Sequence, residues 1–351
     1  MNRAELRGKV QTVLGLIDPE DLGVTLPHEH LVCDGSCWFV EPREATEKAM
    51  VHHPVTLDIL WWLHYHLFQN ADDLLLLDEE QAIEEAMRFK LAGGNSIVEM
   101  SNIGLGRDPA ALVRISRATG LNVIMGSGYY LAVSHGPEME AKPEEEISDE
   151  IVRDIMVGVG DSGIRSGMIG EIGCSWPLAD NERKSLRAAA RAQQLTGAPL
   201  NVHPGQSEEA AMEIIKILDA AGADLTRTTI DHIDRAVRDP ENRIKLAATG
   251  CYLEYDLFGR EGYYPIHHRV IDLPNDAQRI NEIMELIAKG HLNQILISQD
   301  IWNKTQRCAY GGWGYAHILR DTVPVMRVKG MTEQQIHAIM VDNPKRMLTF
   351  V

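Results

Sequence analysis

Hydrophobic and polar residues alternate in a regular order along most of this chain. From residue 79 onward, amphipathic stretches with apolar side chains on one helical face are separated by short apolar runs rich in β-branched residues. Short apolar strands of this kind are typical of a parallel sheet that is buried on both faces. The pattern therefore predicts strands and helices in alternation, joined by right-handed crossovers.

The pattern also gives approximate limits for each element. The first core strand begins at residue 24, and further strands are predicted at residues 96–100, 122–126, 167–172, 199–203, 228–232, 251–255 and 294–300. Helices are predicted at residues 79–92, 108–119, 148–159, 181–195, 207–221, 240–248 and 277–289, with helical segments at about 317–328 and 332–346. Eight such units close more naturally into a (β/α)8 TIM barrel than into an open sheet. A doubly wound sheet is the alternative, although no Gly-x-Gly-x-x-Gly follows the first strand.

Two segments fall outside the alternation. Residues 9–17 have β-rich alternating character and are followed by a turn at Asp18-Pro19-Glu20-Asp21, which predicts a short N-terminal β-hairpin. Residues 33–77 form a long insertion after the first barrel strand, with one aromatic helix predicted at about 56–69. Insertions of this length are usually functional or capping. We expect residues 1–351 to form a single barrel domain, because α/β barrels often reach this length.

Charge and cysteine content narrow the class of protein. The chain has 34 Lys and Arg against 51 Asp and Glu, a net charge of −17, which argues against nucleic acid or an anionic membrane surface as a partner. Its five cysteines form no CxxC and no disulfide framework, so we expect a reducing, cytoplasmic location. The N-terminus does not read as a signal peptide, and no apolar run reaches the ~20 residues of a membrane span.

The chemistry is concentrated where the predicted strands end. His28 and His30 lie one residue apart on an extended segment, so both imidazoles point to the same side. Other polar residues at strand ends are Glu171, His203, His232 and Asp300. In an α/β barrel these ends meet at one mouth, and four histidines with two carboxylates form a full ligand set for two metal ions.

Each of these residues also has a purely structural interpretation. His203 is consistent with a core histidine bonded to the backbone, His232 with a partner of its neighbouring aspartates, and Asp300 with a helix cap. Glu99 competes with Glu171 as the strand-end carboxylate. Together the structural interpretations are weak, since one barrel would bury six polar groups at the same end without use.

Five segments together resemble the phosphotriesterase family of the amidohydrolase superfamily over nearly the whole chain. They are Thr25-Leu26-Pro27-His28-Glu29-His30, Gly170-Glu171-Ile172-Gly173-Cys174-Ser175-Trp176-Pro177, Val202-His203-Pro204-Gly205, Asp231-His232-Ile233-Asp234 and Ile297-Ser298-Gln299-Asp300. The resemblance implies that His28, His30 and Asp300 hold a buried α-metal and that His203 and His232 hold an exposed β-metal. It also implies Asp300 as proton acceptor. Many members bridge the metals with a carboxylated lysine; Glu171 at that position resembles the glutamate-bridged, phosphotriesterase-related branch.

The resemblance implies a binuclear metal-dependent hydrolase in which a metal-bridging hydroxide attacks an amide, ester or lactone carbonyl. The alternatives are phosphotriester hydrolysis and, from another class, a non-catalytic barrel binding protein with a vestigial site. We expect two divalent ions, with Zn2+ first and Mn2+, Co2+ or Fe2+ as alternatives. The expected partner is a small-molecule substrate. The aromatic segment near residues 56–69 is expected either to form a homodimer interface or to pack over the barrel mouth. Candidate substrate contacts on the barrel loops are Tyr130, Tyr255, Arg260, Trp302 and Lys304.

Overall fold

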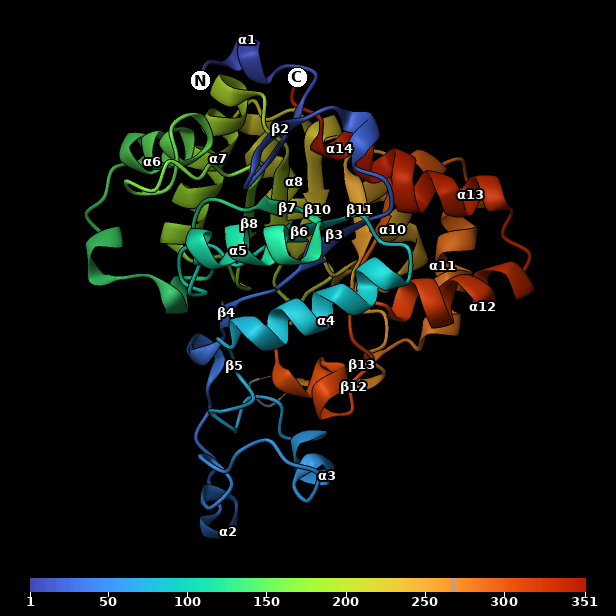
Figure 1. The fold of residues 1–351 in the computed structure, drawn as a ribbon. Coiled ribbons are helices and arrows are strands. Elements are labelled where there is room, and N and C mark those ends of the chain that lie inside the picture. Colours follow the sequence, from blue (N-terminus) through green and yellow to red (C-terminus); the bar gives the residue numbers. More distant parts are fainter. Residues whose placement is uncertain (267–268) are drawn as a thin grey trace.

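The computed structural model describes residues 1–266 and 269–351, and its core consists of eight parallel strands. Helices lie around these strands (Figure 1). The strands are β3 (Thr25–Glu29), β6 (Ser96–Glu99), β7 (Asn122–Met125), β8 (Ile169–Gly173), β9 (Leu200–His203), β10 (Thr228–Ile230), β11 (Tyr252–Tyr255) and β14 (Ile295–Ile297). They form one ladder of three strands, in the order β3-β6-β7, and one of five, in the order β8-β9-β10-β11-β14. This order confirms the predicted TIM barrel.

Hydrogen bonds connect the edges of the two ladders on both sides. Beside β7, the Gly167 N–H donates to the Met125 carbonyl at 2.9 Å. At the other edge, the Glu29 carboxylate on β3 accepts from the Ser298 hydroxyl at 2.8 Å and from the Gln299 and Ile301 N–H groups at 2.9 Å each. The carboxylate of the first barrel strand therefore fixes the loop that follows the last one.

The helices begin and end close to the predicted residues. The long ones are α4 (Glu79–Leu91), α5 (Pro109–Thr119), α6 (Glu144–Met156), α7 (Asp180–Thr196), α8 (Ala210–Ala220), α10 (Pro240–Ala247) and α11 (Asp276–Ala288). Asp78 and Asp108 accept hydrogen bonds from N–H groups in the first turns of α4 and α5, as N-cap residues do. α6 begins four residues earlier than predicted, because Pro143 precedes it and three glutamates occupy its positively polarised first turn.

Apolar side chains fill two regions of the barrel. Between strands and helices lies the main core, which includes Ile97, Val123, Val202, Ile230, Phe89 and Ile115. Alternate strand residues Val98, Ile124 and Leu296 pack instead with Val10 and Met347. Val10 belongs to the predicted hairpin of β1 (Val10–Thr12) and β2 (Gly15–Ile17), and Met347 to α14 (Asn343–Leu348). The hairpin and the last helix therefore close the amino-terminal end of the strands.

The insertion after β3 contains less helix than predicted. The short strands β4 (Cys33–Asp34) and β5 (Leu75–Leu76) pair at its base, and α2 (Ala45–Lys48) and α3 (Leu60–Leu63) lie far from the barrel (Figure 1). The prediction of one helix over 56–69 is wrong. The His66 imidazole Nδ1 lies 2.7 Å from the Trp62 carbonyl, and the His66 N–H donates to Leu63 instead. A side chain thus occupies the carbonyl that a continuing helix would use.

Several smaller elements were not predicted from the sequence. They are α1 (Arg3–Leu6), α9 (Ile233–Ala236) and the antiparallel pair β12 (Gly262–Ile266) and β13 (Arg269–Leu273). The C-terminal segment consists of α12 (Val323–Val328), α13 (Glu333–His337) and α14, with π-helical turns before α12 and α14. Within residues 1–266 and 269–351, no helix has the length and apolar character to cross a membrane.

Candidate metal centre

The residues singled out in the sequence come from five strands and meet at the carboxyl-terminal end of the barrel. His28 lies in β3 and His30 follows it; Glu171 lies in β8, and His203 ends β9. His232 and Asp300 come two and three residues after β10 and β14. All six are at most 7 % exposed. The barrel therefore gathers four imidazoles and two carboxylates into one buried cluster.

Backbone conformation marks two of these positions. In the part of the chain that the structure describes, the non-glycine residues with positive φ are His232, at 52°, and Asp300, at 49°. A left-handed conformation at a residue with a Cβ costs on the order of 1–3 kcal/mol and is concentrated at functional sites. Here it turns the chain sharply after the strand, which directs each side chain to the centre.

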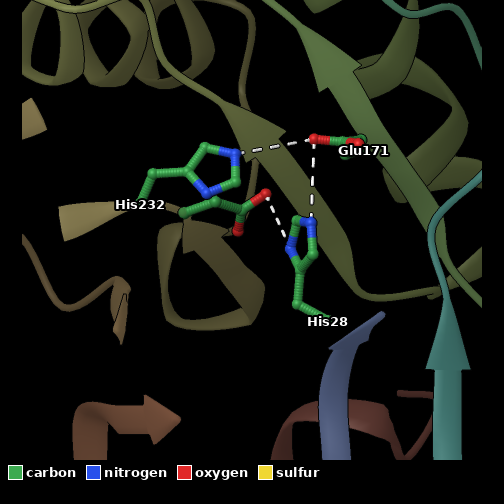
Figure 2. A group of neighbouring side chains, drawn as sticks. His28, Glu171 and His232 are labelled. Atoms are coloured by element: carbon green, nitrogen blue, oxygen red, sulfur yellow. Dashed lines mark ion pairs between the residues drawn. The ribbon is translucent and has the colours of Figure 1, made fainter. Parts of the chain in front are cut away.

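Glu171 occupies the middle of the cluster. Figure 2 shows dashed lines from its carboxylate to both His28 and His232, whose Nε2 atoms each lie 3.8 Å from Glu171 Oε2. The other oxygen, Oε1, lies 3.5 Å from His30 Nε2, and His203 Nδ1 lies 2.9 Å from Oε2. The two oxygens of one carboxylate thus face different histidines.

Asp300 completes the side of the cluster formed by β3. Its Oδ1 lies 3.6 Å from His28 Nε2 and 3.3 Å from His30 Nε2. Ligand atoms around a tetrahedral zinc, with bonds of about 2.0–2.1 Å, are about 3.3–3.4 Å apart. The separations in this group are therefore close to those of a coordination shell.

The donor atoms also pass a test based on unsatisfied polar groups. Both ring nitrogens of His28 are buried and have no hydrogen-bond partner among the described residues. Buried polar atoms almost always have a partner. Nitrogens that face carboxylates at 3.4–3.8 Å without hydrogen bonds fit a cation held between them. The residues present therefore fit a divalent metal ion.

A second layer of carboxylates supports the imidazoles. Asp256, one residue after β11, lies 2.7 Å from His232 Nδ1 through Oδ1 and accepts the His232 N–H at 3.1 Å through Oδ2. Asp231 Oδ2 lies 3.4 Å from His28 Nδ1. His232 therefore pairs with a residue of the next strand rather than with its neighbours Asp231 and Asp234. A carboxylate behind a histidine fixes its tautomer and orientation.

Glu99 has a different role from Glu171. Its carboxylate accepts hydrogen bonds from the N–H groups of Leu31 and Ser101. The Ser101 hydroxyl in turn lies 2.9 Å from His30 Nδ1. Glu99 thus holds the loop after β3 in place, and its oxygens are occupied by the backbone.

Charge interactions within the cluster set its protonation. Burial raises carboxylate pKa values, but His203, His232 and His28 outweigh it at Glu171, whose pKa lies well below its usual value. Burial is similarly outweighed at Asp300, where the facing histidines lower the pKa. Burial and His232 lower the pKa of His203 to about 3. Ionised carboxylates and neutral imidazole are the forms that bind divalent ions.

The pKa values of His28 and His30 shift in the opposite direction from that of His203. Burial lowers their pKa values, but Asp231 and Glu254 outweigh this effect at His28, and Cys33 and Asp300 outweigh it at His30. The pKa values of both imidazoles are therefore raised. A cation that binds them displaces their protons, so its affinity falls at low pH.

A cavity opens from the cluster between the barrel loops. Tyr130 and Trp302, two of the expected substrate contacts, line it together with Trp38, Gln206 and Arg235. The Tyr130 hydroxyl lies 3.4 Å from His203 Nδ1. Trp38 and Trp302 both stack on Phe68 of the insertion, with ring centroids 5.5 and 5.7 Å from it. The insertion thus covers part of the mouth with aromatic rings.

The structure places the other three expected contacts away from this cavity lining. Tyr255 is fully buried in the main core, beside Glu282 and Arg243. Lys304 Nζ lies 2.6 Å from Asp72 in the insertion. Arg260 donates to Asn303 at 3.2 Å and lies over the ring of Trp302, one layer behind the wall. Tyr255 is the last residue of its strand, and its side chain points to the helices. Because side chains alternate between the two faces of a strand, this direction could have been predicted from the sequence.

Sequence reasoning missed four residues of the site. Trp38 comes from the insertion, where no periodic pattern fixes a position. Gln206 and Arg235 each come three residues after a candidate metal ligand, His203 and His232. This position on a barrel loop could have identified them as site residues. Asp256 follows β11 as Asp300 follows β14, and its place at a strand end could have identified it.

Known proteins that resemble this chain identify its family. A model of the phosphotriesterase family matches residues 8–348. The chain is 42% identical over 348 residues to an N-acetyltaurine hydrolase from Bos taurus, covering 99% of each chain. A resiniferatoxin-binding protein from Rhodobacter sphaeroides superposes with a TM-score of 0.95 at 37% identity, covering 99% of this chain and 97% of that one.

A lactonase from Listeria monocytogenes superposes with a TM-score of 0.80 at 27% identity, covering 98% of this chain and 99% of that one. The family match and the relative together extend over almost the whole sequence, and the histidine and carboxylate cluster lies within it. The chain therefore belongs to the phosphotriesterase family, whose members are metal-dependent hydrolases.

Proposed function

We propose that this protein hydrolyses an amide or lactone carbonyl at a centre of two divalent ions, Zn2+ being the first choice. The observation that carries the proposal is the position of Glu171, whose Oε1 faces His30 at 3.5 Å and whose Oε2 faces His203 at 2.9 Å. A carboxylate in this position suits a bridge between two ions. His28, His30 and Asp300 would hold one ion, and His203 and His232 the other.

Carbonyl substrates are favoured by two of the similar proteins. The relative from Bos taurus is named for hydrolysis of N-acetyltaurine, an amide, and the Listeria structure is that of a lactonase. Both names describe cleavage at an acyl carbon. We place amide and lactone hydrolysis ahead of phosphotriester hydrolysis for this reason.

The protein's own residues have separate roles in the proposed reaction. When bound, the ions supply a hydroxide nucleophile at neutral pH and polarise the substrate carbonyl. Asp300, whose pKa is lowered by its histidine neighbours, is ionised and can accept the proton of the attacking water at a carboxylate oxygen. The same oxygen can then donate this proton to the leaving nitrogen or oxygen. Trp38 and Phe68 keep bulk water from the mouth.

Metal content and turnover test the proposal together. Purified protein should carry about two divalent ions per chain, measured by elemental analysis. It should hydrolyse N-acetyltaurine or an aliphatic lactone with a higher kcat/KM than a paraoxon-type triester. His203→Asn should lose one ion and most turnover. His64→Asn, at an exposed histidine of the insertion, is the matched control and should lose neither.

Two outcomes would contradict the proposal. Protein with no metal and no turnover would support the alternative of a binding protein with a vestigial site. Full turnover in the His203→Asn variant would show that the assignment of the second ion is wrong.

Location and assembly belong to the same proposal. We infer a cytoplasmic enzyme, a location supported by five cysteines that are all free thiols. A homodimer is supported by Trp61 and Tyr65 of the insertion, which are 67% and 55% exposed. Light scattering on the intact protein measures the assembly directly.

A further inference from the structure

One wall of the cavity is formed by a buried cation, Arg235. Arg235 is 5% exposed, and none of the described residues forms an ion pair with its guanidinium. Two other buried arginines pair with carboxylates, Arg279 with Asp234 at 2.7 Å and Arg243 with Glu282 at 3.3 Å. The buried Arg227 and Arg307 donate instead to the carbonyls of Met347 and Leu31, and neither lines this cavity. Burying a charge without a counter-charge is costly. Arg235 is therefore suited to an anion supplied from outside the chain.

The position of Arg235 connects the metal cluster with a second chamber. This chamber has a volume of about 490 Å³ and is also lined by Val133, Ser175 and Trp176. Both chambers share Arg235, His203 and Gln206 as walls. A substrate whose carbonyl lies at the cluster can thus extend into the second chamber past the guanidinium.

The hydrogen bonds of Arg235 depend on the state of His203. One guanidinium nitrogen, Nη2, lies 3.0 Å from His203 Nε2, and Nη1 donates to the Pro204 carbonyl at 3.3 Å. An imidazole that gives Nδ1 to a cation carries its proton on Nε2, so Nε2 can no longer accept. His203 Nδ1 faces Glu171, the proposed metal side. With that side engaged, the Nη2 donor is left for another acceptor in the cavity.

We propose that Arg235 is a specificity-determining residue that binds an anionic group on the leaving-group side of the substrate. The substrate class is then an N-acyl amine that carries a sulfonate or carboxylate a few bonds from the amide nitrogen. A guanidinium matches both anions, because its paired N–H groups donate to two oxygens at once. This inference rests on the proposed amide hydrolysis and adds the charge that the site selects.

The test compares two amides of equal length in metal-loaded enzyme. N-acetyltaurine carries a sulfonate, and 2-acetamidoethanesulfonamide is its uncharged counterpart. Wild-type enzyme should prefer the sulfonate in kcat/KM. Arg235→Met should lower kcat/KM for N-acetyltaurine about 10- to 100-fold through KM, the loss expected for a charge-assisted hydrogen bond, and should change the sulfonamide less than about threefold. Arg235→Lys should recover part of the preference.

The matched control is Arg238→Gln, which removes the same charge from an exposed position three residues further along the chain. It should leave both substrates unchanged. Equal losses for both substrates in Arg235→Met, or loss of bound metal, would overturn the proposal, because they would mean that Arg235 only positions His203. An unchanged KM for N-acetyltaurine would overturn it as well.

A binding measurement tests the role of Arg235 independently of the proposed hydrolysis. If wild-type enzyme hydrolyses neither amide, the proposed reaction fails, and calorimetry of N-acetyltaurine binding then decides about Arg235. Tighter binding of the sulfonate than of the sulfonamide, abolished by Arg235→Met, supports the anion site. Equal affinities for the two compounds in wild-type protein contradict it.

Discussion

Replacing Asp256 with Asn should weaken one metal site without unfolding the barrel. The Asp256 carboxylate lies 2.7 Å from His232 Nδ1 and accepts the His232 N–H at 3.1 Å. The Nδ1 proton is thereby fixed, and the Nε2 lone pair points to Glu171 and His203. An amide has one acceptor oxygen for these two donors, and its NH2 group favours the tautomer that carries the proton on Nε2.

The expected loss of metal affinity follows from this change of the His232 tautomer. Loss of a carboxylate behind a metal-binding histidine typically costs 10- to 100-fold in metal affinity or activity, which is about 1.4–2.7 kcal/mol. We expect Asp256→Asn to show this loss for the ion that we propose at His203 and His232 and to retain the other proposed ion. Titration of zinc against a chromophoric chelator measures both affinities.

A matched control distinguishes metal binding from stability. Asp154 is also buried and accepts from Arg107 at 2.8 Å and from Ser127 at 2.9 Å, outside the cluster. Asp154→Asn should lower the free energy of unfolding and leave both zinc affinities unchanged. Two unchanged affinities in Asp256→Asn, together with normal turnover, would refute the reasoning about the tautomer.

Two further predictions concern stability. Arg279→Leu leaves Asp234 buried without its partner at 2.7 Å and should cost about 3–5 kcal/mol in urea unfolding; a loss below ~1 kcal/mol would contradict the importance of this pair. Burial lowers the pKa of His317, but Asp276 and Asp321 outweigh it and raise the pKa. The stabilisation is then fully present below pH ~6.5 and disappears as the pH rises through the raised pKa. His317→Gln should therefore destabilise the protein by about 1 kcal/mol at pH 6 and by less at pH 9. Thermal melts that show the same destabilisation at both pH values would argue against an ion pair between His317 and its aspartate neighbours.

Strand positions could be predicted because they follow from hydrophobic pattern alone. A run such as Ile169–Gly173 is short, bounded by loops and apolar except for Glu171, and its place in a parallel sheet explains these properties. The polar residues at the strand ends could be found for the same reason. A histidine or carboxylate in an otherwise apolar run needs a partner.

Contacts made by loops could not be predicted in this way. The aromatic content of residues 56–69 indicated a helix, but one hydrogen bond from the His66 imidazole to Trp62 alters its course. Lys304 was an expected substrate contact, and Asp72 of the insertion binds it instead. The first contact is local but depends on the rotamer of His66, and the second joins residues that are 232 positions apart. Hydrophobic periodicity encodes neither of them.

The Glu29 carboxylate joins two parts of the chain that are 270 residues apart. During synthesis, β3 leaves the ribosome long before the segment that it has to hold. The nascent chain therefore carries an open sheet edge until β14 emerges, and Asp300 arrives only then. The ion proposed for His28, His30 and Asp300 can therefore bind only after nearly the whole message has been translated, and a product truncated before β14 would lack both the closed sheet and this ligand.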